Sequence, residues 1–140
     1  MMKKILLVED NEAEAEIVKL LVDDKYSDVI ELIHIENGLD VIEYINNNNV
    51  DLILLDINIP GKNGKEIAKY IRFELKKYIP IVILSTSDNN NDVNECYSYY
   101  VNSYLVKPIN FNVFEEMFDR VIQYWIDFNT GQHNDAYSLD

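Results

Sequence analysis

Short apolar segments alternate with segments of helical periodicity along the chain. Runs rich in Ile, Leu and Val predict strands at 4–8, 29–35, 50–56, 79–85 and 102–107. Most of these runs are continuous rather than alternating, which is typical of a parallel sheet covered on both faces. The second run contains more polar residues, so we expect it near an edge of the sheet.

Between the predicted strands, apolar residues recur at helical spacing. The predicted stripes are Ile17, Leu20 and Leu21; Leu39, Ile42 and Ile45; and Ile67, Ile71 and Leu75. A weaker helix is predicted from about 90 to 100, and a long last helix from about 111 to 128 with Asn110 as its N-cap. This alternation predicts an α/β fold of the (βα)₅ type, a flavodoxin-like doubly wound parallel sheet of order 2-1-3-4-5.

Composition and charge narrow the class of protein. The 140 residues are 48% hydrophobic, which indicates one domain with a substantial core at 1–128, followed by a loosely ordered tail at 129–140. No apolar stretch is long enough to span a membrane, and the one cysteine, Cys96, fits the reducing cytoplasm. The formal net charge of −13 disfavours nucleic acid as a partner.

Polar residues stand where four of the predicted strands end. In chain order they are Glu9 and Asp10, Asp56, Ser85 and Thr86, and Lys107. The carboxyl ends of parallel strands lie at one edge of a sheet, and open α/β sheets bind ligands there. We therefore expect these side chains to form one shallow pocket of carboxylates, hydroxyls and an ammonium group.

Such a pocket suits phosphoryl chemistry. Clustered carboxylates repel one another, and a hard cation such as Mg²⁺ relieves that repulsion. A carboxylate can attack phosphorus and become an acyl phosphate, whose charge then needs stabilising partners. The pattern predicts Asp56 as nucleophile, with Lys107 and Ser85 binding the phosphoryl oxygens. Pro60, with Gly61 and Gly64, bends the chain away from it.

Four segments resemble the receiver domain of two-component response regulators. They are "LLVEDNE", "LILLDINIPGKNG", "IPIVILSTS" and "SYLVKPI", in the family's order and spacing, and the resemblance covers about residues 3 to 128. It implies that Asp56 accepts a phosphoryl group, which Lys107 binds. It also implies that Mg²⁺ is held by Asp10 and Asp56, by Glu9 through metal waters and by the Asn58 carbonyl. The bond between Lys107 and Pro108 is expected to be cis, as in the family.

The resemblance also assigns conformational roles. Ser85 resembles the switch hydroxyl and Tyr104 the switch aromatic, while Thr86 stands where many members have a smaller residue, which narrows access to the phosphoryl group. Among receivers, "VILSTS", "NSYLVKP" and "YW" at 124–125 are most similar to the stand-alone regulators that accompany phytochromes. The implied protein is a phosphorylated signalling protein rather than a conventional enzyme. A phytochrome-like sensor histidine kinase or a phosphotransfer protein would phosphorylate it, and it would signal through the face of its fourth helix, fifth strand and fifth helix.

Other functions remain open at this level. A degenerate receiver would act as a phosphorylation-independent binding module, but it would lack an acidic or lysine position, and none is missing. A haloacid-dehalogenase-type phosphatase needs a second aspartate where Asn58 stands, and a flavodoxin needs a phosphate-binding loop where "VEDNEAE" would repel phosphate. A DNA-binding regulator would need a second domain after residue 128.

The last predicted helix is apolar around much of its circumference. The apolar positions are Phe111, Val113, Phe114, Met117, Phe118, Val121, Ile122, Tyr124, Trp125 and Phe128. They span an arc of roughly 200°, about twice the stripe that one core contact requires. Part of this helix is therefore expected to stay exposed and to support a homodimer, unless the tail after Asn129 covers it.

Overall fold

The computed structural model of the chain describes residues 2–131, which form one five-stranded parallel sheet. Its strands are β1 (Lys3–Val8), β2 (Ile30–Ile35), β3 (Leu52–Leu55), β4 (Ile81–Ser85) and β5 (Ser103–Val106). The strand order is β2-β1-β3-β4-β5, and every neighbouring pair is parallel. The predicted fold and order are confirmed, and β2 lies at an edge as its polar residues indicated.

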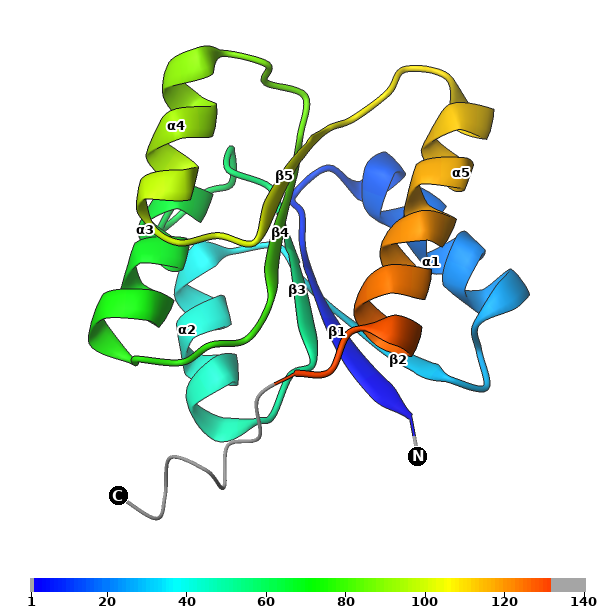
Figure 1. Cartoon of the computed structure of the whole chain (residues 1–140), viewed down its shortest axis with the longest axis horizontal. Helices are drawn as coiled ribbons and strands as arrows, with labels where there is room; N and C mark the ends of the chain where they lie inside the picture. Colours follow the sequence, from blue (N-terminus) through cyan, green and yellow to red (C-terminus); the bar gives the residue numbers. More distant parts are fainter. Residues whose placement is uncertain (1, 132–140) are drawn as a thin grey trace.

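Helices cover both faces of the sheet. They are α1 (Glu12–Lys25), α2 (Gly38–Asn47), α3 (Gly64–Lys69), α4 (Asn90–Ser98) and α5 (Phe111–Ile122). Figure 1 shows α2, α3 and α4 on one side of the sheet and α1 and α5 on the other. Neighbouring residues of a strand point to opposite faces, so Leu6 packs with the first group and Ile5 with the second. The central strands β3 and β4, and β1 from Ile5 onward, are therefore buried on both faces, whereas the edge strands β2 and β5 are only partly buried.

Asparagine side chains begin the helices. Asn110 caps α5 by accepting a hydrogen bond from the backbone N–H of Val113 at 3.1 Å, as predicted. The other caps are Asn11, Asn37, Asn63 and Asn89, which stand before α1, α2, α3 and α4. The chain continues past α3 and α5 in wider π-helical turns, Tyr70–Glu74 and Gln123–Phe128. The last helical segment thus extends to residue 128, as its apolar pattern predicted.

Three expectations about local structure are wrong. Leu20 is 59% and Leu39 is 62% exposed, because α1 and α2 turn neighbouring apolar residues, such as Val18 and Val41, towards the sheet. No cis peptide bond occurs within residues 2–131, so the bond between Lys107 and Pro108 is trans. The trans form is the ordinary preference of such bonds, by about 0.5–1 kcal/mol.

The two remaining expectations about organisation concern the tail and the membrane. Most of the predicted tail at 129–140 lies outside the described residues. Within the part of the chain that the structure describes, no helix is both long and apolar enough to cross a membrane.

Candidate functional site

Three polar residues are buried as whole residues within 2–131, and all belong to the strand ends that the sequence singled out. Glu9 follows β1 and is 3% exposed, Asp56 follows β3 and is 9% exposed, and Ser85 ends β4 with no exposed surface. Burying a carboxylate is unfavourable unless it has partners or a task. Two buried carboxylates at the same end of one sheet therefore mark this end as the candidate site.

Lys107 supplies the positive charge of the site. It follows β5, and its side chain is only 7% exposed. Its ammonium group contacts three carboxylates, those of Glu9, of Glu14 at 3.0 Å and of Asp56 at 3.4 Å. The structure therefore brings Glu9, Asp56 and Lys107 together from three different strands, as the sequence predicted.

Burial and charge perturb the protonation of this cluster. Burial raises the pKa of Glu9 from 4.5 to about 7, an effect that Lys107 partly offsets and the charge of Asp56 reinforces. Burial lowers the pKa of Lys107, but its hydrogen bond to Glu9 and the nearby charges outweigh that effect and leave the pKa raised. The site thus holds more negative charge than one ammonium group can neutralise.

The carboxylates fit a divalent cation. Oxygen atoms of Glu9, Glu14 and Asp56 lie within 4.8 Å of one another, and carboxylate oxygens are the ligands that Mg²⁺ prefers. Glu14 lies in the first turn of α1 and was not singled out from the sequence. Asp10 is exposed and is not part of this close group, so its role as a ligand stays a prediction.

The turn after Asp56 fixes the direction of its carboxylate. The backbone N–H of Asn58 donates a hydrogen bond to Asp56 Oδ1 at 3.1 Å, and the Asn58 side chain is exposed. Gly61 has φ of 80°, a conformation that favours glycine. A Cβ atom on Gly64 would lie 2.4 Å from the carbonyl oxygen of Asp56, so α3 begins in direct contact with the site.

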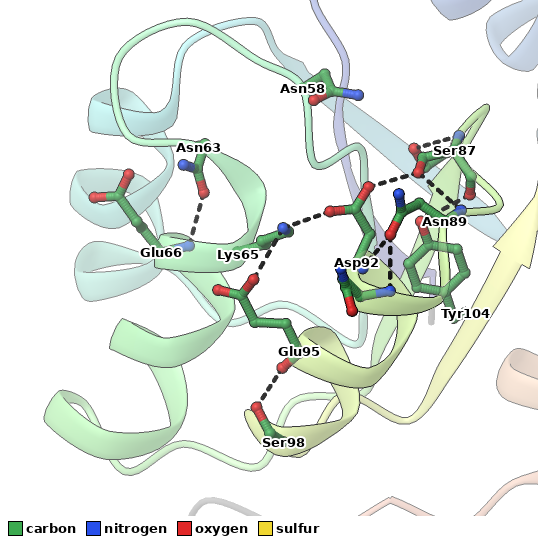
Figure 2. A network of polar contacts seen from close by, with 12 residues as sticks. Asn58, Asn63, Lys65, Glu66, Ser87, Asn89, Asp92, Glu95, Ser98 and Tyr104 are labelled. Atoms are coloured by element: carbon green, nitrogen blue, oxygen red, sulfur yellow. Dashed lines mark hydrogen bonds and ion pairs between the residues drawn. The ribbon is translucent and has the colours of Figure 1, made fainter.

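The predicted switch residues meet on a third residue, Ser87. Ser85 Oγ accepts a hydrogen bond from the backbone N–H of Ser87 at 3.2 Å. The Tyr104 hydroxyl donates to the carbonyl oxygen of Ser87 at 2.8 Å (Figure 2). Thr86, the predicted access residue, lies exposed between the two serines. The loop after β4 is therefore attached both to the buried hydroxyl of the site and to β5.

A polar network continues from Ser87 to α3. Ser87 Oγ donates to Asp92 Oδ2 at 2.6 Å, and Lys65 Nζ donates to Asp92 Oδ1 at 2.6 Å and to Glu95 at 3.0 Å (Figure 2). Hydrogen bonds from Lys65 and Ser87 hold the pKa of Asp92 below its usual range. The sequence did not predict this network, because Ser87 lies in a loop, Lys65 on α3 and Asp92 and Glu95 on α4, and none of them is part of an apolar pattern.

Comparisons with known proteins agree with this geometry. The family model of the response regulator receiver domain matches residues 5–119. Response regulator Rcp1 from Synechocystis is 37% identical over 134 residues, covering 89% of this chain and 90% of Rcp1. A probable methanogenesis regulatory protein, FilR2 from Methanothrix harundinacea, is 30% identical over 132 residues, which cover 89% of this chain and 84% of FilR2.

Solved structures give the same result. A phosphorylated cyanobacterial phytochrome response regulator, RcpA, matches with a TM-score of 0.84 and 32% identity, covering 93% of this chain and 98% of RcpA. The Mn²⁺-bound form of Rcp1 matches with a TM-score of 0.83 and 35% identity, covering 94% and 99%. The similarity to phytochrome-associated regulators noted from the sequence is confirmed. The chain therefore belongs to the response regulator receiver domain family, as its fold, its strand-end residues and these relatives show.

Proposed function

We propose that this chain accepts a phosphoryl group on Asp56 in the presence of Mg²⁺ and signals through the resulting change in its surface. The observation that carries this proposal is the contact of Lys107 with the buried carboxylates of Glu9 and Asp56 at one end of the sheet. A sensor histidine kinase or a phosphotransfer protein is the expected donor. The similarity to RcpA, a phosphorylated cyanobacterial phytochrome response regulator, supports a phytochrome-like kinase as this donor.

Each residue of the site has a separate role in the proposed phosphoryl transfer. An oxygen of Asp56 attacks phosphorus in line, a P–O bond forms, and the P–N bond to the donor imidazole breaks with its electron pair left on nitrogen. A bound Mg²⁺ would neutralise charge on the phosphoryl oxygens. Glu9 and Asp56, with Glu14 or Asp10, would hold this ion. The ammonium group of Lys107 would stabilise the developing negative charge, and the Ser85 hydroxyl would donate to a phosphoryl oxygen.

The test is phosphorylation by a small phosphodonor. Incubation with the donor and Mg²⁺ should add one phosphoryl group to the intact mass, and a chelator should prevent it. Asp56→Asn should abolish the adduct. Asp51→Asn is the matched control, because Asp51 lies at the opposite end of β3 and binds the Lys4 backbone N–H at 2.8 Å. Labelling of Asp56→Asn equal to wild type would contradict Asp56 as the acceptor, and no labelling of wild type would favour a phosphorylation-independent binding module.

The identity of the donor needs a separate experiment. A panel of purified histidine kinases and phosphotransfer proteins, each carrying labelled phosphohistidine, would be incubated with the wild-type chain and with Asp56→Asn. We expect at least one donor to transfer its label within seconds to wild type only. Transfer from none of them, although a small phosphodonor labels Asp56, would contradict a histidine kinase as partner.

We also propose a homodimer through α5 as part of the output surface. Val113 on α5 and Tyr124 in the π-helical turn that follows it are 51% and 55% exposed, and they line a groove of about 460 Å³ beside β5. Glu116 and Arg120 line the same groove and form an ion pair with each other along the helix, so this pair would lie beside the apolar contact in a two-fold dimer. In such a dimer, the exposed apolar side chains of this helix would be buried against the same face of a second copy.

Sedimentation tests the dimer. The full chain should sediment as a dimer at micromolar concentration, and Tyr124→Glu should sediment as a monomer. Leu20→Glu places the same charge on a side chain of similar exposure on α1 and should remain dimeric. A wild-type monomer, with or without phosphodonor, would contradict this proposal.

A further inference from the structure

We propose that Lys65 is a positioning residue that holds α4 and Ser87 in the resting arrangement and so opposes the change that follows phosphorylation. This inference rests on the proposed function and adds a regulatory element to it. It predicts that the protein without Lys65 reaches its activated surface more readily.

Ser87 is the point where the site, β5 and α4 are joined. Its backbone N–H is bound to Ser85 Oγ, and its carbonyl oxygen to the Tyr104 hydroxyl. Its own hydroxyl binds Asp92 in the first turn of α4 and also accepts from the backbone N–H of Asn89 at 3.3 Å. Any movement of Ser87 is therefore transmitted to the start of α4 and to Tyr104 (Figure 2).

Lys65 on α3 holds Asp92, the residue of α4 that binds the Ser87 hydroxyl. Its ammonium group bridges Asp92 and Glu95, one turn apart on α4, and its side chain is 22% exposed. Lys65 directly follows Gly64, whose backbone lies against the carbonyl oxygen of Asp56. The bridge thus ties α4 to the part of α3 that is itself held beside the phosphorylation site.

The hydrogen bond between Ser85 and Ser87 explains how the ion pairs of Lys65 would oppose activation. A phosphoryl group on Asp56 would accept a hydrogen bond from the Ser85 hydroxyl, and rotation of Ser85 towards it would carry Oγ away from the Ser87 N–H, whose hydrogen bond Oγ now accepts. Once Ser85 turns to the phosphoryl group, the Ser87 N–H needs a new acceptor and the loop must move. The hydrogen bond to Asp92 resists that movement for as long as Lys65 holds Asp92 in place.

Three variants separate this role from general stabilisation. Lys65→Met removes the charge and keeps the aliphatic chain, whereas Lys65→Arg keeps a cation that can bind both carboxylates. Lys25→Met is the matched control, because Lys25 bridges Glu115 and Asp119 at 3.0 and 2.9 Å between α1 and α5, away from Ser87. All three are full-length chains measured beside wild type.

Two measurements give the result. In the resting protein, amide hydrogen exchange over 87–93 should be about two- to fivefold faster in Lys65→Met than in wild type, the range set by the modest strength of partly exposed ion pairs. Binding of beryllofluoride with Mg²⁺, a non-covalent mimic of the phosphoryl group, should tighten by a similar factor. Lys65→Arg should resemble wild type, and Lys25→Met should change neither quantity.

The outcomes are distinct for the two proposals. Equal exchange over 87–93 in Lys65→Met and wild type, or equal beryllofluoride affinity, would overturn the role of Lys65. The same changes in Lys25→Met would also overturn it, because the effect would then be general loss of stability. Failure of wild type to bind beryllofluoride would contradict the proposed function. The comparison of amide exchange between Lys65→Met and wild type would still test whether Lys65 holds α4 in place.

Discussion

Replacing Glu9 with glutamine should change how stability depends on pH. The pKa of Glu9 is raised in the folded protein from 4.5 to about 7, mainly by burial, and its side chain is 4% exposed. A carboxyl group whose pKa is raised on folding stabilises the folded state at low pH. That contribution is complete below the unfolded pKa of 4.5 and is lost as pH rises through 7.

The magnitude follows from the two pKa values. Each tenfold change in proton affinity corresponds to about 1.4 kcal/mol, so between pH 5 and pH 8 Glu9 should reduce the free energy of unfolding by roughly 2–3 kcal/mol. This figure is an upper limit, because Lys107 remains beside the ionised carboxylate. Glu9→Gln lacks this loss, so its stability should fall less over the same range.

Urea unfolding in the presence of a chelator provides the assay. The fluorescence of Trp125, the one tryptophan in the chain, reports unfolding at pH values from 5 to 8. Glu16→Gln, at an exposed position on α1, is the control and should parallel wild type. Parallel profiles of wild type and Glu9→Gln would refute the argument that Glu9 is buried at a perturbed pKa.

Mg²⁺ should reverse the sign of this dependence. A divalent cation binds the ionised carboxylates, so its stabilisation of the folded state grows as pH rises. At a concentration 100 times its Kd, a ligand that binds only the folded state adds about 2.7 kcal/mol. Wild type with saturating Mg²⁺ should therefore be more stable at pH 8 than at pH 5, and failure to reverse would contradict metal binding at Glu9.

Three other substitutions test separate parts of the structure. Lys107→Ala should remain folded, although it leaves the buried carboxylates of Glu9 and Asp56 without their cation, and it should slow the formation of the phosphoryl adduct by about tenfold or more, measured by intact mass over time; simple unfolding would make its role structural. Glu14→Gln should weaken Mg²⁺ binding by about two- to fivefold in calorimetric titration, since it removes one charge from the cluster, and unchanged affinity would exclude Glu14 from the site. Phe118→Ala, at a position 2% exposed, should destabilise the protein by about 3–5 kcal/mol in urea, whereas Leu20→Ala should have little effect.

The strand pattern predicted most of the fold because its information is local. Continuous apolar runs such as Leu52–Leu55 are buried on both faces. The polar residue that follows each run lies at the carboxyl end of its strand, where the site is. Helix faces were less certain, because α1 carries more apolar residues than one face needs. Leu20 is consequently exposed while Val18 and Val22 are buried.

The site was predicted where residues follow strands and missed where they lie on helices. Glu14 reaches Lys107 because Asn11 begins α1 and sets the rotation of its first turn, a detail visible only once the cap is known. Lys65 and Asp92 are 27 residues apart on different helices, and their contact depends on how α3 and α4 pack. Such pairings require tertiary structure, since no spacing in the sequence encodes them.

Mapping the phosphorylated residue tests the central claim most directly. The protein would be incubated with a phosphodonor and Mg²⁺ and treated with borohydride, which reduces an aspartyl phosphate to homoserine, before peptide mass analysis. We predict homoserine at position 56 and at no other aspartate, with none formed when a chelator is present. Modification at Asp10 instead, or unmodified Asp56 in protein that carries the phosphoryl mass, would contradict the account.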